Sequence, residues 1–319
     1  MDALSDVLKS VRFEGALYVN AEFTAPWSMR GRYGMASVRQ RLAGAEHVVY
    51  FHLITEGSCK VKLADSDEVL DLTAGDLILF PQDDRHLMGS HLHVAPLDAE
   101  NFNGGNDPAP ELVPLCHGGG GAVTRFVCGF LACNRGMCRP LLDALPRVLR
   151  ISIGDGAAAG LLVELLRRGV QESSTQLPGA QSTLAKLAEL MFVEALRRYV
   201  ESLPPGGKGW LAAVRDGQVG RALALLHGEP GRPWTVDELA RAVALSRSAL
   251  AERFAALVGE PPMQYLMRWR LALAARTLRS GHEALARVAE RSGYESQAAF
   301  NRAFKREFGL PPAAWRRAA

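Results

Sequence analysis

Residues 294–312 read YESQAAFNRAFKREFGLPP and residues 244–262 read ALSRSALAERFAALVGEPP, so the chain repeats one pattern at an offset of 50 residues. Apolar side chains recur at every fourth position in both copies, which is the spacing of one buried stripe on an α-helix. The two stripes are Leu250, Phe254 and Val258, and Phe300, Phe304 and Phe308. The expected caps are Ser246 and Gly259 in the first copy, and Ser296 or Glu295 with Gly309 in the second. Each copy is therefore predicted to be a capped helix with one apolar face.

A shorter helical pattern precedes each of these helices, at 236–243 and at 284–291. Two helices joined by a turn of three or four residues form a helix-turn-helix. The exposed side of the second long helix is expected to carry Gln297, Asn301, Arg302, Lys305 and Arg306. Amides and cations on one side can read base edges and hold phosphates in a DNA major groove. A solvated basic face would be the simpler interpretation of a single helix, and the tandem repeat favours DNA binding.

The first long helix is expected to expose Ser248, Ala251 and Glu252, with Arg247 and Arg253 toward its edges. A glutamate can accept a hydrogen bond from cytosine, and small side chains allow close approach to bases. This helix could therefore discriminate bases while the second supplies more of the charge. It could equally act mainly to position the second helix.

The runs 235–278 and 285–317 together closely resemble the DNA-binding domain of the AraC/XylS family of bacterial transcription regulators. The resemblance implies two helix-turn-helix units joined by a long helix, here about 262–279, with recognition helices entering successive major-groove segments on one face of DNA. It places base contacts at Ser248, Ala251, Glu252, Gln297, Ala298, Asn301 and Arg302. The alanines at 251 and 298 depart from the polar residues often found there. With the flanking cations Arg247, Lys305 and Arg306, these residues make up the expected DNA-binding set.

The formal charge is unevenly distributed along the chain. Residues 217–319 contain 16 Lys and Arg against 9 Asp and Glu, whereas residues 1–216 contain 21 against 25. A basic C-terminal third on an acidic remainder is typical of a polyanion-binding module attached to a domain of another kind.

The N-terminal half alternates apolar and polar residues in short runs broken by turn sequences, as expected of antiparallel β-hairpins. Within it, GDLILFPQDDRH at 75–86 resembles the second cupin motif, and the similarity to the cupin sensor domains of AraC-type regulators extends to about Leu149. The predicted fold class is α+β, with an N-terminal cupin-like β-barrel or sandwich, a helical hairpin and a C-terminal all-α double helix-turn-helix. The predicted boundaries are 1–150 for the sensor, 151–203 for a dimerisation hairpin, 204–216 for a linker and 217–319 for the DNA-binding domain.

Two histidines are the candidate effector-binding residues. The cupin-like motifs should bring His52 and His86 together inside the sandwich, where they would supply polar contacts in an apolar pocket. Cupin enzymes bind metal through a larger set, and here only Glu56 and one of His91 or His93 could be added. No cofactor is expected, and a metal is the less favoured alternative. A metal-dependent cupin enzyme that carries a nucleic-acid-binding module is the alternative function.

Cys128, Cys133 and Cys138 are spaced by five residues, and Arg135 and Arg139 lie among them. Nearby cations can lower a thiol pKa and make it reactive toward oxidants, so these residues are candidate redox thiols. The simpler interpretation is that Cys128 is a small apolar strand residue and that the other two are incidental.

The segment 181–200 has apolar residues on two sides, with Leu184, Leu187 and Met191 on one and Phe192, Leu196 and Tyr199 on the other. We expect one side to pack on the β-domain and the other on a second subunit, which gives a homodimer. Core packing within one chain is the alternative explanation. The other expected partners are operator DNA, a small-molecule effector and RNA polymerase. The expected location is the bacterial cytoplasm, without membrane attachment, because the N-terminus is acidic and amphipathic and no long apolar run occurs.

Overall fold

The computed structural model describes residues 2–10, 13–32, 35, 45–98, 113–133, 135–153, 157–174, 177–204, 206–281 and 283–317. The chain divides into two compact units. One, here called the barrel unit, is Phe13–Cys133 with Leu145–Glu201. The other, the helical unit, is Met1–Arg12, Asn134–Ala144 and Ser202–Ala319. Among the described helices, none is long and apolar enough to cross a membrane.

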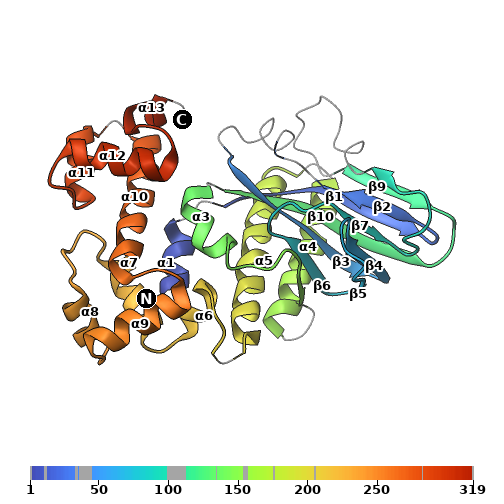
Figure 1. The fold of residues 1–319 in the computed structure, drawn as a ribbon. Coiled ribbons are helices and arrows are strands. Elements are labelled where there is room, and N and C mark those ends of the chain that lie inside the picture. Colours follow the sequence, from blue (N-terminus) through green and yellow to red (C-terminus); the bar gives the residue numbers. More distant parts are fainter. Residues whose placement is uncertain are drawn as a thin grey trace. The chain divides into compact units, whose positions relative to one another are not determined.

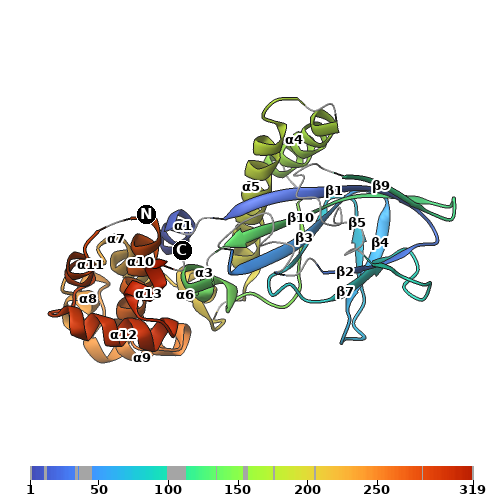
Figure 2. The ribbon, with the colours of Figure 1, turned by 90° about the horizontal axis from the view of Figure 1, so that it is seen from above.

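The barrel unit contains two β-sheets, which lie over one another in Figure 2. The larger sheet has the strand order β11-β6-β3-β10-β1-β9 and the smaller sheet the order β5-β4-β7-β2-β8. The strands of the larger sheet are β1 (Glu14–Thr24), β3 (His47–Glu56), β6 (Asp76–Phe80), β9 (Val113–Gly118), β10 (Val123–Cys133) and β11 (Leu149–Ser152). Those of the smaller sheet are β2 (Ser28–Gly31), β4 (Ser58–Leu63), β5 (Leu70–Thr73), β7 (His86–Gly89) and β8 (Leu97–Asp98). The predicted β-rich fold of the N-terminal half is confirmed.

The space between the two sheets is filled by apolar and aromatic side chains. Trp27, Phe23 and Phe126 pack in one aromatic group, with Trp27 and Phe126 stacked at 5.4 Å between ring centroids. The register of β3 on β10 pairs His52 with Cys128, and the register of β2 on β7 pairs Gly31 with His86. Polar side chains from both sheets therefore enter one apolar core.

The helices α4 (Ala157–Ser174) and α5 (Ala180–Ser202) form a hairpin beside the larger sheet (Figures 1 and 2). Gly15 of β1 allows the close approach of α5, because a Cβ at this position would lie 2.9 Å from the carbonyl oxygen of Ala185. Phe13 packs on Phe192 of α5 with 4.9 Å between ring centroids. The hairpin is thus an integral layer of the barrel unit.

Both expected faces of α5 are covered within this one chain. Leu184 and Leu187 pack on Gly169 of α4, and Phe192 packs toward the sheet. The residues Leu184, Leu187, Met191, Phe192 and Leu196 are all buried, and Tyr199 is half-buried. The expectation that one of these faces stays open for a partner subunit is therefore wrong, because α4 occupies it. Among the described residues of the two helices, the exposed leucines are Leu161 and Leu165 of α4 and Leu190 of α5.

The helical unit carries the repeat. Its helices are α1 (Ala3–Ser10), α3 (Arg135–Leu142), α6 (Trp210–Arg215), α7 (Val219–Gly228), α8 (Val236–Ala242), α9 (Arg247–Val258), α10 (Pro262–Ser280), α11 (Leu285–Arg291), α12 (Gln297–Phe308) and α13 (Pro312–Arg317). The pairs α8–α9 and α11–α12 are the two helix-turn-helix units, and α10 is the long helix between them (Figure 1). The helical fold predicted for the C-terminal part is confirmed.

The caps of the two longer helices follow the sequence pattern. The hydroxyls of Ser246 and Ser296 each accept a hydrogen bond from the backbone N–H three residues later, at 3.2 Å. Gly259 and Gly309 end the helices with left-handed φ values of 88° and 76°. Of the two candidates for the second N-cap, the structure selects Ser296.

The two turns differ by one residue. Thr235 caps α8 and Ala284 precedes α11, an offset of 49, whereas the N-caps of α9 and α12 are 50 residues apart. Both turns need a left-handed residue, and the first uses Ala244 at φ 57° where the second uses Gly293 at φ 76°. Alanine is strained in this conformation and glycine is not.

The helical unit is larger than the expected 217–319 domain. The segment expected as a linker contains α6, in which Trp210 and Leu211 are buried. The indole of Trp210 donates to the Tyr265 hydroxyl of α10 at 2.9 Å, so α6 is a structural part of this unit. The unit also takes in α1 and α3, which come from the N-terminal half of the sequence.

Candidate functional site

The exposed side of α12 is strongly basic. Arg302, Lys305 and Arg306 are exposed, and none of the three has a carboxylate partner in the part of the chain that the structure describes. Gln297 and Ala298 are exposed at the N-terminal end of the same helix. Phe300 and Phe304 hold the opposite side in the core, where both are fully buried. A helix that inserts into a DNA groove needs cations on its exposed side, and buried apolar side chains on its other side hold it in the domain.

The first helix, α9, presents less free charge. Arg247 pairs with Asp237 of α8 at 3.5 Å, and Arg253 pairs with Asp216 at 2.6 Å. Ser248 and Glu252 are exposed between these arginines. Since its cations are already paired within the unit, α9 offers hydroxyl and carboxylate groups and α12 offers positive charge.

Two predicted base-contacting residues lie less openly. Ala251 is half-buried, and so is Asn301, whose Oδ1 is buried without a hydrogen-bond partner among the described residues. A base contact through Asn301 would therefore use its amide nitrogen or require the side chain to turn.

In the barrel core, His52 lies between two other polar side chains. Its Nε2 is 2.8 Å from Nε2 of His86, and its Nδ1 is 2.8 Å from the Sγ of Cys128. All three side chains are buried, with at most 1% of their surface exposed. The expected meeting of His52 and His86 is thus present in the geometry. Their role as effector ligands remains a prediction.

The hydrogen bonds of Cys128, His52 and His86 form one row, and the proton positions along it follow from the end at His86. Nδ1 of His86 lies 3.0 Å from the carbonyl oxygen of Asp84, which can only accept, so this nitrogen carries a proton. In a neutral His86, Nε2 then accepts from Nε2–H of His52. The Nδ1 of His52 in turn accepts from the thiol of Cys128. One directional chain of neutral groups therefore runs from Cys128 to Asp84.

Burial keeps the hydrogen-bonded side chains of His52, His86 and Cys128 uncharged. It lowers the pKa of His86 to about 4 and, together with His86, holds the pKa of His52 well below its usual 6.5. Burial also raises the pKa of the Cys128 thiol far above its ordinary value. Phe80 stacks on His86 at 3.7 Å between ring centroids, and a Cβ at Gly31 would lie 2.1 Å from its Nε2, so the imidazole is tightly enclosed.

Two further polar atoms in this core have no hydrogen-bond partner among the described residues. They are the Nε1 of Trp27 and the Oγ of Ser28, both buried. Trp27 stacks on Phe126, whose ring centroid is 6.1 Å from that of His52. Unpaired donors in an apolar core are groups that a bound molecule could satisfy.

The larger histidine set does not assemble. His91 and His93 are exposed in a turn after β7, with 5.7 Å between their ring centroids, and do not join His52 and His86. Across the described ranges, no three His, Cys, Asp or Glu side chains are placed to bind a metal ion. The accepting nitrogens of His52 and His86 already receive hydrogen bonds, so a metal would first have to displace protons.

The three candidate redox cysteines are separated by the fold. Cys128 and Cys133 belong to the barrel unit and Cys138 to the helical unit, and all three side chains are buried. Arg139 pairs with Asp143 at 3.2 Å. The structure thus gives Cys128 an unreactive environment, because its thiol is buried and protonated. The exposed cysteine is Cys116 of β9.

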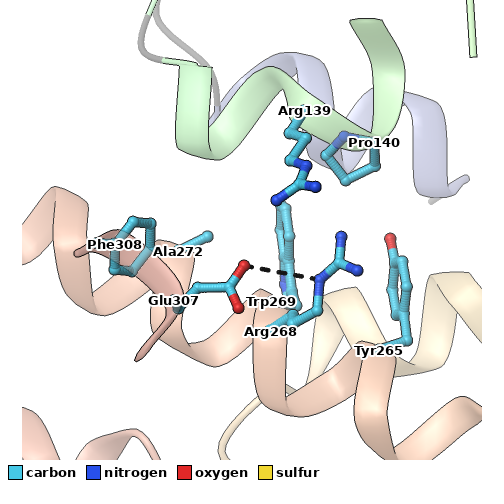
Figure 3. Close-up of a pocket in the computed structure, with 8 residues that line it drawn as sticks. All are labelled: Arg139, Pro140, Tyr265, Arg268, Trp269, Ala272, Glu307 and Phe308. Carbon is cyan, nitrogen blue, oxygen red and sulfur yellow. Dashed lines mark ion pairs between the residues drawn. The ribbon is translucent and has the colours of Figure 1, made fainter. Parts of the chain in front are cut away.

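A pocket of the helical unit lies where α3 meets α10 and the end of α12 (Figure 3). Its lining residues are Arg139, Pro140, Tyr265, Arg268, Trp269, Ala272, Glu307 and Phe308. Arg268 pairs with Glu260 at 3.2 Å and with Glu307 at 3.8 Å, and Arg139 extends from α3 toward this group. A segment inserted between two strands of the barrel sequence thus reaches α10, the helix that joins the two helix-turn-helix units.

Sequence reasoning missed several of these residues. The partnership of Cys128 with His52 depends on the register of β10 against β3, which the strand pattern does not fix. The Pro and Gly residues before Trp210 led to the prediction of a linker, so the place of Trp210 in the helical unit was missed. An aromatic residue directly after a Pro/Gly segment was the available signal.

Known protein families match both the N-terminal and the C-terminal part of the chain. A cupin family profile matches residues 2–201 and a helix-turn-helix domain profile matches residues 239–318. A putative AraC-like transcription regulator of Streptomyces lividans is 34% identical over 318 residues, covering 99% of this chain and 98% of that protein. The regulator AlkR of Acinetobacter baylyi is 29% identical over 99% of both chains. The DNA-binding domain of AdpA, solved with a target DNA, is 30% identical over 32% of this chain and 93% of that domain, with a TM-score of 0.31.

The cupin profile covers more than half of the chain, and the Streptomyces relative matches nearly all of it. The resemblance first seen in the repeat is therefore confirmed over the whole length. The chain belongs to the AraC family of DNA-binding transcriptional regulators, with a cupin domain in its N-terminal half.

Proposed function

We propose that this protein is an effector-responsive regulator that binds operator DNA through α9 and α12 and senses a small molecule in the core of its barrel unit. The observation that carries the DNA-binding half is the set of exposed cations Arg302, Lys305 and Arg306, which have no carboxylate partner among the described residues and lie opposite the buried side chains of Phe300 and Phe304. The proposed base-reading set remains Ser248, Ala251 and Glu252 in α9, and Gln297, Ala298, Asn301 and Arg302 in α12. Lys305 and Arg306 are the proposed phosphate contacts, and Arg247 is a further proposed DNA-binding residue at the edge of the α9 surface.

The sensing half rests on the polar groups in the barrel core. His52 and His86 hydrogen-bond each other, while Trp27 and Ser28 keep a buried donor without a partner among the described residues. A neutral organic effector with an acceptor group would satisfy Trp27 and compete for the proton between the histidines. Regulation, and not catalysis, is the proposed role of this core, since its hydrogen bonds are directed at one another.

A route from sensor to DNA is also proposed. The chain enters the helical unit as α1, enters it again as α3, and finally enters it before α6. An effector can shift DNA binding only if it binds the DNA-competent and DNA-incompetent arrangements with different affinities. We place the coupling in α1 and α3, because they are continuous with strands of the barrel unit and belong to the unit that reads DNA.

We further propose that the protein is a cytoplasmic homodimer that contacts RNA polymerase at promoters. The dimer surface is assigned to Leu161, Leu165 and Leu190, which are the large apolar side chains left exposed on the paired helices of the hairpin.

The proposal is tested by selecting DNA from a random library with the full-length protein and sequencing what it retains. A preferred sequence with two separated segments would support it. Retention of random sequences in proportion to the input would refute it.

A further inference from the structure

Arg270 is a buried cation at the middle of the helix that joins the two helix-turn-helix units. Only 8% of its surface is exposed, and burial lowers its pKa. In the described part of the chain it has no carboxylate partner. Burying an unpaired charge is unfavourable unless many hydrogen bonds compensate for it. The partners of this guanidinium therefore indicate what it does.

On one side, Arg270 holds the segment that leads into the first helix-turn-helix. Its Nε donates to the carbonyl oxygen of Pro230 at 2.6 Å, and one Nη donates to that of Arg232 at 2.7 Å. These carbonyls lie just before Thr235, the N-cap of α8. A planar guanidinium that binds two carbonyls fixes direction as well as distance.

On its other side, Arg270 touches the turn of the second helix-turn-helix. A Cβ at Gly293 would lie 2.5 Å from Nη1 of Arg270 and 3.0 Å from its Cζ. Glycine at 293 therefore serves two needs at once, since the turn also requires a left-handed residue at φ 76°. The segment before α8 also approaches the second unit directly, because a Cβ at Gly231 would lie 4.0 Å from the carbonyl oxygen of Arg291.

We propose that Arg270 is a positioning residue that locks the two helix-turn-helix units at one separation and rotation, and so sets the spacing between the two DNA segments that the protein reads. The inference rests on the proposed function, because it presumes that α9 and α12 both enter DNA grooves. One base pair more or less between two segments rotates one against the other by about 34° and shifts it by about 3.4 Å. A rigid pair of reading helices cannot follow such a change, whereas a loosened pair can.

The test uses the full-length protein and the sequence it selects from a random DNA library, together with copies in which one base pair is added or removed between the two segments. The wild-type protein should lose about tenfold or more in affinity at either altered spacing. Arg270→Met keeps an unbranched side chain and removes the guanidinium donors. This variant should bind the original spacing about tenfold more weakly and lose less than about threefold further when the spacing changes.

Matched variants separate positioning from folding. Arg276→Met removes the same charge from an exposed position on the same helix and should keep the wild-type spacing dependence. Arg270→Lys can reach one carbonyl and should restore part of that dependence. Gly293→Ala pushes against the guanidinium without removing charge, and its effect should be smaller in the Arg270→Met background than alone.

The proposal would be overturned if Arg270→Met unfolds at the same temperature as the wild type and loses the same factor of DNA affinity at every spacing. If Arg270→Met does not fold, a wild-type spacing dependence in both Arg270→Lys and Gly293→Ala would overturn it equally. Failure of the wild-type protein to select any DNA sequence would contradict the proposed function itself.

Discussion

The imidazoles of His52 and His86 share a hydrogen bond of 2.8 Å across the core of the barrel unit, although they are 34 residues apart in the chain. One comes from a strand of the larger sheet and the other from a strand of the smaller sheet. The pair therefore ties the two sheets together at a point closed to water. A molecule that binds in this core either forms hydrogen bonds with the two histidines or leaves the hydrogen bond between them intact. Substitution of either histidine distinguishes the two cases.

His52→Ala or His86→Ala is predicted to abolish effector-dependent regulation while leaving effector-free DNA affinity nearly unchanged, because neither side chain belongs to the DNA-reading unit. Reporter assays in cells, paired with DNA titrations of the purified variants, check both parts. His93→Ala, an exposed histidine outside the core, is the control and should respond as wild type. An intact inducer response in both core variants would place the sensing chemistry elsewhere.

Acidification is predicted to destabilise the barrel unit. The pKa of His86 is lowered to about 4 and that of His52 lies well below 6.5, so both are below their unfolded values. Their contribution is complete above about pH 6.5 and is lost as the pH falls toward 4, since the unfolded chain then binds protons that the native state does not.

Urea unfolding at pH 7.5 and at pH 5 measures this loss, which should be about 2 kcal/mol for His86. His86→Gln should remove one histidine's share of the difference. The same pH dependence in wild type and variant would show that His86 is not held neutral in the native state.

Arg302→Ala is predicted to weaken binding to the selected DNA by about 1–3 kcal/mol and to relax base preference at one position. Lys305→Ala should weaken specific and random DNA alike and reduce the salt dependence, as expected of a phosphate contact. Titrations of each variant on both DNAs at several salt concentrations distinguish the two roles. If Arg302→Ala loses equally on both DNAs, Arg302 is not a base-reading residue.

Leu165→Lys is predicted to shift the protein toward monomer, because it places a charge on the proposed dimer surface of the hairpin. Sedimentation at micromolar concentration measures the shift. Leu177→Lys is the control, since Leu177 is also exposed but lies in the connection between the two helices. A wild-type protein that sediments as a monomer with and without DNA would contradict the dimer altogether.

The sequence predicted the DNA-binding part most closely, because its signals are local. Stripes of Phe300 and Phe304, caps such as Ser246 and terminators such as Gly309 act within one or two helical turns, and each appears in the structure as expected. The meeting of His52 with His86 was also predictable, since it follows from two recognisable motifs.

What the sequence could not provide depends on packing between distant segments. The apolar sides of α5 were visible, but only the fold shows that α4 and the larger sheet cover both. The chain of hydrogen bonds from Cys128 to Asp84 needs strand register, and the double contact of Arg270 needs the path of a loop 40 residues away. Membership of α1 and α3 in the helical unit has no local signature.

The most direct test of the account is hydroxyl-radical footprinting of the full-length protein on its selected DNA. Two recognition helices joined by α10 should protect two segments on one face of the DNA, with centres about one helical turn, or about 10 base pairs, apart. Arg302→Ala should weaken protection in one segment more than in the other. A single protected segment, or protection that is uniform along the DNA, would contradict the claim that α9 and α12 read DNA together.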